Sequence, residues 1–522
     1  MSIRLLARAC LIVVLLPAAG LAADRRLADA ADHGDQALVR RLIEQRVDVN
    51  TKGVDGTTAL HHAVHSDQLT IADLLLRSGA DATAGDRYGV TPLYLACLNG
   101  NAGMIERLIE AGADPNLADA TGETPLMTAA RNGIPSALRA LLGRGARVEA
   151  RDPEFGQTAL MIAVRENHPA AVDLLIGAGS AVDAQTRKGP TPKFVPPCKG
   201  TGCGSEGVGI NRGGLPDRGR RAEAKGGMTP LLYAARDGRV DAARMLVAGG
   251  ADIELAEANG IRPLLMAVLN NNLSIAQFLL AHGADVNGDD FWGRSPLWAA
   301  VEYRNLDMNN RDQDSPIDNG VDRAPILAFV QALLDAGADV NSRTRDVPPS
   351  RRWLYSLGDV SWVDFTGQTP FLRAALSGDT AAMRLLLQYG ADPNLATAAN
   401  TTPLMAAAGV NWAVAQTYTE SPQARLDAVT LCLELGADVN ASNSMGLTAL
   451  IGAANRGSND IIQLLVDRGA RLDIKDREGR TPLRWAEGVF LAAVGAERKP
   501  ETIALLERLA SRSANSDGTA AR

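Results

Sequence analysis

The chain has 522 residues, of which 46% are hydrophobic and only 4% aromatic, and it carries a formal net charge of −7. This mildly acidic balance excludes a general affinity for nucleic acid, which requires a basic surface. Its length alone would suggest about three domains of ~150 residues each. The chain repeats itself, however, and an array of repeats grows without a larger core because each unit packs only on its neighbours.

The first 23 residues have the pattern of an export signal. Two arginines precede an apolar run at residues 9–16, and small residues follow as far as Ala23. This order is typical of a signal peptide, with cleavage expected after Ala22 or Ala23. A membrane anchor is the alternative, but the run is shorter than the ~20 residues that a spanning helix needs. We therefore predict a periplasmic or secreted protein with no membrane span after cleavage.

A motif of the type Thr-Pro-Leu-x-x-Ala recurs along the rest of the chain. Neighbouring copies lie 33 residues apart in most places, as from Thr91 to Thr124, and self-similarity at this period predicts a stacked array of short units. The copies begin at Thr58, Thr91, Thr124, Thr158, Thr229, Arg262, Ser295, Thr369, Thr402, Thr448 and Thr481.

Each copy has the residues that start a pair of helices. Thr is a good N-cap because its hydroxyl accepts from free backbone N–H groups, and Pro suits the first helical position. The Ala that lies five residues after the cap allows neighbouring helices to approach closely. A second apolar helix then ends at Gly-Ala-Asp, where glycine supplies a positive φ. Residues 27–50 fit a degenerate first copy, with Ala30 in the Ala position.

Four interruptions of the period predict long insertions near residues 184–228, 303–324, 342–368 and 410–423. The first and third lie in the turns between successive units, and the other two lie between the helices of one unit. Long loops without regular structure are usually either functional or disordered.

The insertion at 184–228 is basic and rich in glycine. One hypothesis is a docking loop for an acidic partner or an anionic polymer, and the other is a flexible, solvated excursion. Cys198 and Cys203 lie within it and could form a small disulfide ring in an oxidising compartment. As a zinc site they supply only half of the ligands. Cys97 and Cys432 lie in helical segments and are expected to be small buried apolar residues.

The insertion at 342–368 gathers aromatic residues in a chain that has few of them. Aromatic residues and arginine dominate binding hot spots, so we take this set as the candidate partner-binding site. Its members are Arg351, Arg352, Trp353, Tyr355, Trp362 and Phe365. The alternative is a small satellite core that fixes the loop against the stack.

The eleven capped copies, their 33-residue spacing and their Gly-Ala-Asp ends resemble the ankyrin repeat family over residues 27–510. The resemblance implies an all-α ankyrin repeat solenoid of about twelve helix-turn-helix units, with short hairpin fingers and long loop insertions. It places a repeat domain at residues 24–510, followed by a disordered tail at 511–522. The family often has His after Leu, and only His61 keeps it here. The other copies mostly have apolar residues there, which favours packing over chemistry.

Catalytic motifs are absent from the sequence, which has neither Gly-x-Ser-x-Gly nor His-Glu-x-x-His. His62 and His65 share a helical face, but no third metal ligand accompanies them, so we interpret them as surface histidines. We therefore expect no catalytic, cofactor-binding or metal-binding residues.

The resemblance implies a non-enzymatic, exported scaffold that binds another protein through its concave and finger face, as a monomer and without a cofactor. One alternative is an enzyme whose site is built from the inserted loops. Another is a purely architectural envelope protein or a secreted effector.

Overall fold

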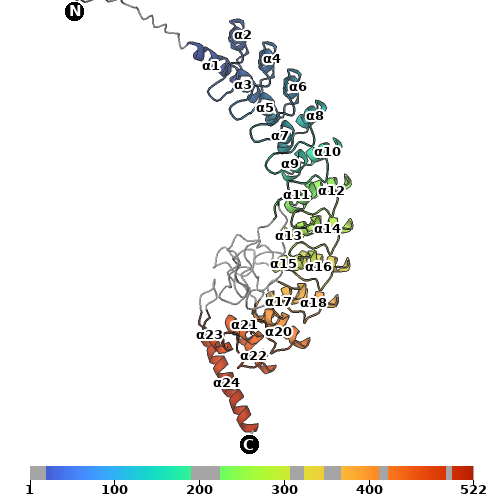
Figure 1. The fold of residues 1–522 in the computed structure, drawn as a ribbon, viewed down its shortest axis with the longest axis vertical. Helices are drawn as coiled ribbons and strands as arrows, with labels where there is room; N and C mark the ends of the chain where they lie inside the picture. The colour runs from blue at the N-terminus through green and yellow to red at the C-terminus, as the bar shows by residue number, and fades with distance from the viewer. Residues whose placement is uncertain are drawn as a thin grey trace, which may run out of the picture. The chain divides into compact units, whose positions relative to one another are not determined.

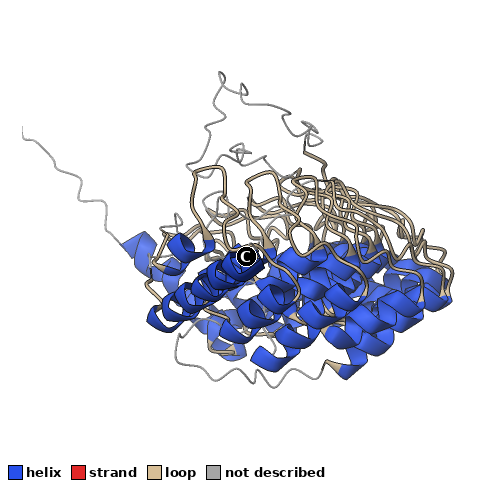
Figure 2. Cartoon of the chain, turned by 90° about the horizontal axis from the view of Figure 1, so that it is seen from below, coloured by secondary structure: helices blue, strands red, loops and turns tan. Residues whose placement is uncertain are grey.

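The structure is a computed structural model that describes residues 19–189, 224–305, 323–345, 366–410, 421–489 and 497–520. Over these ranges its regular structure consists of helices, with no strand (Figure 2). The helices form twelve successive pairs in the described part of the chain. They divide into two compact units, Met1–Ala184 and Gln185–Arg522, called unit 1 and unit 2. The sequence predicted one uninterrupted run, and the division falls where the 184–228 insertion begins.

Unit 1 contains the first five helix pairs, and the first helices of successive pairs pack in one row while the second helices pack in another (Figure 1). The pairs are α1 (Ala19–Asp32) with α2 (Gln36–Glu44), α3 (Ala59–His65) with α4 (Leu69–Arg77), α5 (Pro92–Asn99) with α6 (Ala102–Glu110), α7 (Pro125–Asn132) with α8 (Pro135–Gly143), and α9 (Ala159–Arg165) with α10 (Pro169–Gly177).

Unit 2 continues the same pattern with seven pairs in its described ranges. They are α11 (Pro230–Asp237) with α12 (Val240–Ala248), α13 (Pro263–Leu269) with α14 (Leu273–Ala281), α15 (Pro296–Arg304) with α16 (Ala324–Asp335), α17 (Pro370–Ser377) with α18 (Thr380–Gln388), α19 (Pro403–Ala408) with α20 (Pro422–Glu434), α21 (Ala449–Arg456) with α22 (Asn459–Asp467), and α23 (Pro482–Ala486) with α24 (Pro500–Ala520).

The helix starts have the local chemistry that the repeated motif predicts. At the start of α5, the side chain of Thr91 accepts from the backbone N–H of Tyr94 at 3.3 Å, and Pro92 occupies the first helical position. The alanine five residues after the cap is buried in all eleven capped copies, and Ala30 is buried in the first pair. The predicted close packing of the first helices is therefore confirmed.

Successive repeats are also joined by backbone and amide hydrogen bonds. Asn116 donates to the carbonyl oxygen of Gly145 at 3.1 Å and accepts from the N–H of Arg147 at 2.7 Å. Gly112, which ends the second helix of its repeat, has the positive φ of 101° that its position requires. Hydrogen bonds of this kind connect neighbouring repeats through polar groups, in addition to the apolar contacts between their helices.

Most of the short fingers are tight turns that are closed by an acidic or amide side chain, and the finger before α19 is closed by the hydroxyl of Thr397. Asp86 accepts from the N–H groups of Tyr88 and Val90, at 2.8 and 2.9 Å. A backbone bond from Arg87 to the carbonyl oxygen of Asp55, at 3.0 Å, joins this finger to the previous one. The fingers therefore form a connected set of loops along one side of the helices within each unit (Figure 2).

Two fingers carry a long insertion, and in both of them it begins and ends at the same position of the turn. Thr186 donates its N–H to the carbonyl oxygen of Met228 at 3.0 Å, and Thr344 donates to that of Gln368 at 3.1 Å. The hydroxyl groups of Thr186 and Thr344 accept from the N–H groups of the same two partners. The insertions predicted near 184–228 and 342–368 therefore leave and return across a preserved finger base.

The structure describes the two ends of the chain to different extents. Residues 1–18, which hold most of the predicted signal peptide, lie outside the described residues, and α1 begins at Ala19. At the other end, α24 continues to Ala520, where the sequence predicted a disordered tail from residue 511. Once a helix has started, each further residue adds one hydrogen bond, which favours its continuation. Among the described helices, none is long and apolar enough to cross a membrane.

Candidate functional site

The residues singled out in the two finger insertions lie outside the described part of the chain. This holds for the candidate disulfide and for all six residues of the candidate partner-binding set, so both stay predictions. The two other cysteines are described, and Cys97 and Cys432 are free and buried, as expected. Burial raises the pKa of both thiols.

Unit 1 presents large apolar side chains at the tips of its fingers. Val54, Tyr88 and Phe155 are exposed, the two aromatic side chains by 58% and 54%. The guanidinium of Arg87 lies 4.8 Å from the centre of the Tyr88 ring, in a cation–π contact. Apolar side chains at the tips of exposed turns gain nothing from the core, so these positions are available for contact with a partner.

The first helices of unit 1 add a second set of exposed side chains next to the finger bases. Leu98 on α5 and Arg131 on α7 are each 43% exposed. Arg165 ends α9 and donates to Gln157, the last residue of the neighbouring finger, at 3.0 Å. Contacts of this kind join the first helices of unit 1 to the bases of its fingers, and we group the exposed side chains of both elements. We call this the unit 1 face, and it comprises Val54, Tyr88, Leu98, Arg131, Phe155 and Arg165.

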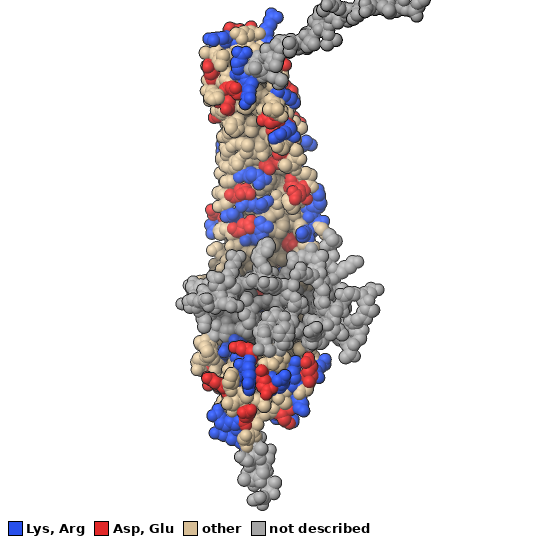
Figure 3. Space-filling model, turned by 90° about the vertical axis from the view of Figure 1, so that its left-hand side faces the viewer, with Lys and Arg blue, Asp and Glu red and all other residues tan. Residues whose placement is uncertain are grey.

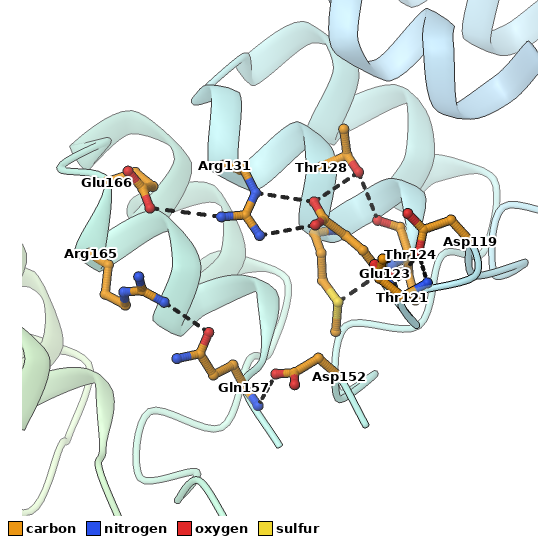
Figure 4. A network of polar contacts seen from close by, with 11 residues as sticks. Asp119, Thr121, Glu123, Thr124, Thr128, Arg131, Asp152, Gln157, Arg165 and Glu166 are labelled. Carbon is orange, nitrogen blue, oxygen red and sulfur yellow. Dashed lines mark hydrogen bonds and ion pairs between the residues drawn. The ribbon is translucent and has the colours of Figure 1, made fainter. Parts of the chain in front are cut away.

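A network of polar contacts fixes the charged part of this face (Figure 4). Arg131 donates to both carboxylate oxygens of Glu123, at 3.2 and 3.0 Å, and lies 3.9 Å from a carboxylate oxygen of Glu166. Thr128 donates to Glu123 at 3.1 Å. The hydrogen bond with Glu123 raises the pKa of Arg131. The guanidinium is therefore held in one orientation, although part of it faces solvent.

The histidines near the start of unit 1 serve mainly to join repeats. His61 is buried, its Nδ1 lies 2.9 Å from the hydroxyl of Thr58, and its Nε2 lies 3.1 Å from the carbonyl oxygen of Val90. Burial lowers the pKa of His61. His62 lies 3.8 Å from Asp32. In the described ranges no group of three or more His, Cys, Asp or Glu residues could hold a metal ion.

The position of His61 is a packing position in most other repeats, as predicted. Its counterparts Met127, Leu232, Trp298 and Leu372, for example, are buried. Two repeats depart from this pattern, because Tyr94 is half-buried and Arg484 is exposed. The sequence pattern alone did not separate these two from the rest.

Unit 2 has a different inner face around α15 and α17. Glu302, Arg304, Arg373 and Leu376 are all buried there. Arg304 donates through Nε to Asp379 at 2.7 Å, and Arg373 donates to the carbonyl oxygen of Asn305 at 3.1 Å. Burial lowers the pKa of Arg373. This part of unit 2 therefore holds charged groups within its packing rather than offering them to a partner.

Charged side chains of both signs lie on the side of the molecule drawn in Figure 3. On this side, Lys and Arg side chains are interspersed with Asp and Glu side chains within each unit. A surface of mixed sign gives little attraction to a polyanion as a whole.

The paired helices, connecting fingers and 33-residue spacing define a helical repeat protein. Family models confirm which one: the model of ankyrin repeats in three copies matches residues 27–119, 103–186, 231–310 and 420–489, and a single-repeat model matches 366–395. The chain belongs to the ankyrin repeat family, and its fold class is the all-α one that the sequence predicted.

Among curated proteins, the chain is 29% identical over 168 residues to the putative ankyrin repeat protein YahD of Escherichia coli, a match that covers 30% of this chain and 66% of that protein. It is 38% identical over 93 residues to the human ankyrin repeat domain-containing protein 63, covering 18% of this chain and 22% of the relative. The chain thus spans between about a fifth and two thirds of the length of these relatives.

Among solved structures, the ankyrin repeat domain of human ASB11 aligns with 25% sequence identity and a TM-score of 0.38. The alignment covers 50% of this chain and 98% of that domain. Ankyrin repeats in general form scaffolds that bind other proteins, and this is the class of function that the family implies.

Proposed function

We propose that this chain is a non-enzymatic, exported scaffold that binds another protein through the unit 1 face. The observation that carries the proposal is the exposure of Val54, Tyr88 and Phe155 at three finger tips of one unit. Aromatic side chains contribute a large contact area at a low cost in conformational entropy, and they dominate binding hot spots.

The polar side of the same face supports this assignment. Arg131 and Arg165 are already held by Glu123 and Gln157, so little side-chain freedom remains to be lost when a partner binds. Arginine held in this way still presents N–H groups and an apolar stem. The face therefore combines aromatic anchors with ordered polar groups, as protein interfaces do.

The test is recovery of partner from cell-envelope extract by immobilised protein, comparing the wild type with the double variant Tyr88→Ser, Phe155→Ser. Truncating one hot-spot aromatic residue costs ~2 kcal/mol or more, which is over tenfold in affinity. Tyr389→Ser is the matched control because Tyr389 is exposed at the end of α18 in unit 2. Undiminished recovery with the double variant would reject the unit 1 face.

The aromatic insertion at 342–368 is a second candidate for the same function. Replacing Trp353, Tyr355 and Trp362 with Ala tests it in the same assay, with circular dichroism to monitor helicity. Loss of partner with retained helicity in this variant, but not in the unit 1 variant, would move the binding surface to the insertion. Loss of helicity would instead favour the satellite core.

Export is a separate part of the proposal and rests on the sequence of the first 23 residues. A protein purified from the periplasm or the culture medium should begin at residue 23 or 24 by mass spectrometry. A mature protein that still begins at Met1, or that stays with the cytosolic fraction, would contradict export. That outcome would leave the binding surface untouched.

A further inference from the structure

The finger tips of unit 1 are held at a regular interval by their own backbone. The N–H of Arg87 donates to the carbonyl oxygen of Asp55 at 3.0 Å, and the N–H of Ala120 donates to that of Tyr88 at 3.1 Å. The path from one accepting carbonyl oxygen to the next is one hydrogen bond and two residues, and two residues span at most ~7 Å. Successive tips therefore lie up to about 10 Å apart, in agreement with the spacing of about 8–10 Å between the axes of packed helices.

The exposed apolar side chains occupy the first, second and fourth fingers of the unit. Val54 lies on the first, Tyr88 on the second and Phe155 on the fourth, whereas the third tip has Ala120 and Thr121. The helices that follow the third and fourth fingers, α7 and α9, pack on each other as the earlier first helices do. The three apolar side chains are therefore separated by one interval and then by two.

This interval matches one peptide conformation well. A polyproline II helix has three residues per turn and rises ~3.1 Å per residue, so every third residue faces the same side after about 9 Å. In a β-strand the third residue lies at a similar distance but points to the opposite face. Seven residues of an α-helix also cover about 10 Å, but the carbonyl groups of that helix are used within it. Those of a polyproline II segment are free to accept hydrogen bonds.

The second finger tip offers donors to such carbonyl groups. The side chains of Arg87 and Tyr88 are both exposed, and the guanidinium lies 4.8 Å from the centre of the Tyr88 ring. Within the described ranges, neither the guanidinium of Arg87 nor the hydroxyl of Tyr88 has a hydrogen-bond partner. An aromatic surface with free donors beside it is the arrangement that recognises proline-rich segments.

The charges at the first two tips favour an acidic side chain on the partner. The carboxylates of these fingers are occupied within their own turns, as for Asp55, which accepts from the N–H and the hydroxyl of Thr57 at 3.1 and 2.6 Å. Lys52 is exposed and contacts only the carbonyl oxygen of Gly85, at 3.4 Å, in the described part of the chain. Lys52 and Arg87 are therefore the charged groups that these two tips present to a partner.

We propose that the unit 1 face binds a proline-rich segment of its partner in the polyproline II conformation. Apolar side chains at positions i, i+3 and i+9 of the segment contact Val54, Tyr88 and Phe155, and an acidic side chain next to position i+3 pairs with Arg87. This proposal rests on the proposed scaffold function, because it names the class of partner that the same face takes.

The first experiment measures binding of labelled synthetic peptides to the full chain by fluorescence anisotropy. The probe is a proline-rich peptide with leucine at the first, fourth and tenth positions and glutamate at the fifth. We expect saturable binding, and binding at least tenfold weaker when the leucines are moved to the first, third and seventh positions. Absence of saturable binding by the probe would overturn the proposal. So would equal or tighter binding of a helical peptide with leucine at the first, eighth and twenty-second positions.

Variants of the protein locate the contacts of the probe. The double variant Tyr88→Ser, Phe155→Ser should weaken binding of the probe by over tenfold. Arg87→Glu should weaken it by about three- to fivefold, because an exposed ion pair contributes modestly, and should favour a lysine version of the probe by a similar factor. Arg139→Glu makes the same charge change at an exposed position of α8, away from the fingers, and should alter neither. Equal effects of Arg87→Glu on both probes would overturn the pairing with an acidic side chain.

Competition separates this proposal from the scaffold function itself. Excess probe should displace the partner that the immobilised protein recovers from cell-envelope extract. If recovery depends on Tyr88 and Phe155 but the probe does not displace the partner, the polyproline II assignment is wrong and the binding face remains. If recovery does not depend on these two residues, the face and the assignment are both wrong.

Discussion

The inner faces of the two units are built from the same helix positions and yet differ in what they expose. Seven residues after the cap, α5 has Leu98, which is 43% exposed, whereas α17 has Leu376, which is 3% exposed. At the same position, α7 has Arg131, which is 43% exposed, whereas α15 has Glu302, which is buried. The repeated motif therefore determines the position of a side chain on its helix. The residues around that position determine whether the side chain is exposed or buried.

The largest expected effect comes from the buried pair of unit 2. Asp379→Ala should destabilise the protein by about 3–5 kcal/mol, because it leaves Arg304 buried without its carboxylate and removes the cap of α18. Asp35→Ala removes the corresponding cap of α2 in unit 1, where Asp35 is exposed, and should cost ~1 kcal/mol. Urea unfolding of both variants measures the difference, and equal losses would contradict the contrast between a buried and an exposed aspartate cap.

The next effect should be the same in both units. Ala129→Leu in α7 and Ala267→Leu in α13 each insert bulk at a fully buried contact between first helices. Overpacking typically costs ~1–3 kcal/mol, and here it separates two neighbouring helices. Calorimetry should show a lower Tm for both variants. A loss in only one of them would show that the Ala position does not play the same part in both stacks.

Acidification should weaken unit 1 through His61. Burial holds the pKa of His61 below its usual value, so below that value the unfolded chain binds more protons than the folded one. Stability is therefore present near neutral pH and falls as pH drops through the ordinary histidine range. Tm measured from pH 7 to pH 5 should decline less steeply for His61→Met, which puts there the residue found at Met127 and Met161. Parallel declines would remove His61 as the cause.

The smallest effect on stability is expected at the finger tips. Tyr88→Ser should change the free energy of unfolding by no more than ~0.5 kcal/mol, because an exposed tip contributes little to the stack. Tyr88 differs in this respect from Trp298, which is fully buried on α15. A large loss of Tm from Tyr88→Ser would mean that the tip is part of the packing and would weaken the unit 1 face as a binding surface.

Local features of the fold were predictable from the sequence because they depend on residues close together in the chain. The cap at Thr91, the buried position of Ala96 and the glycine stop at Gly112 each follow from one repeat read by itself. The finger insertions were located because they lengthen the regular spacing between successive caps, from Thr158 to Thr229 and from Ser295 to Thr369.

Contacts across the array were not predictable in this way. Arg304 and Asp379 are 75 residues apart, and Arg425 meets Ser458 from the neighbouring repeat. Nothing in one repeat shows which charged side chains will be paired or buried. The finger-tip aromatic residues did leave a signal, because Tyr88 and Phe155 each precede the glycine of a polar turn that has no core to cover them.

The preserved finger bases have a consequence for engineering and for evolution. Because Thr186 and Met228 stay hydrogen-bonded, the two ends of the inserted segment are held together by the scaffold and not by the segment itself. A new segment of another length or sequence would meet a closure cost that grows only slowly with its length. Each finger tip is thus an attachment point at which the protein can acquire a new specificity while its helices, and the stability they provide, remain as they were.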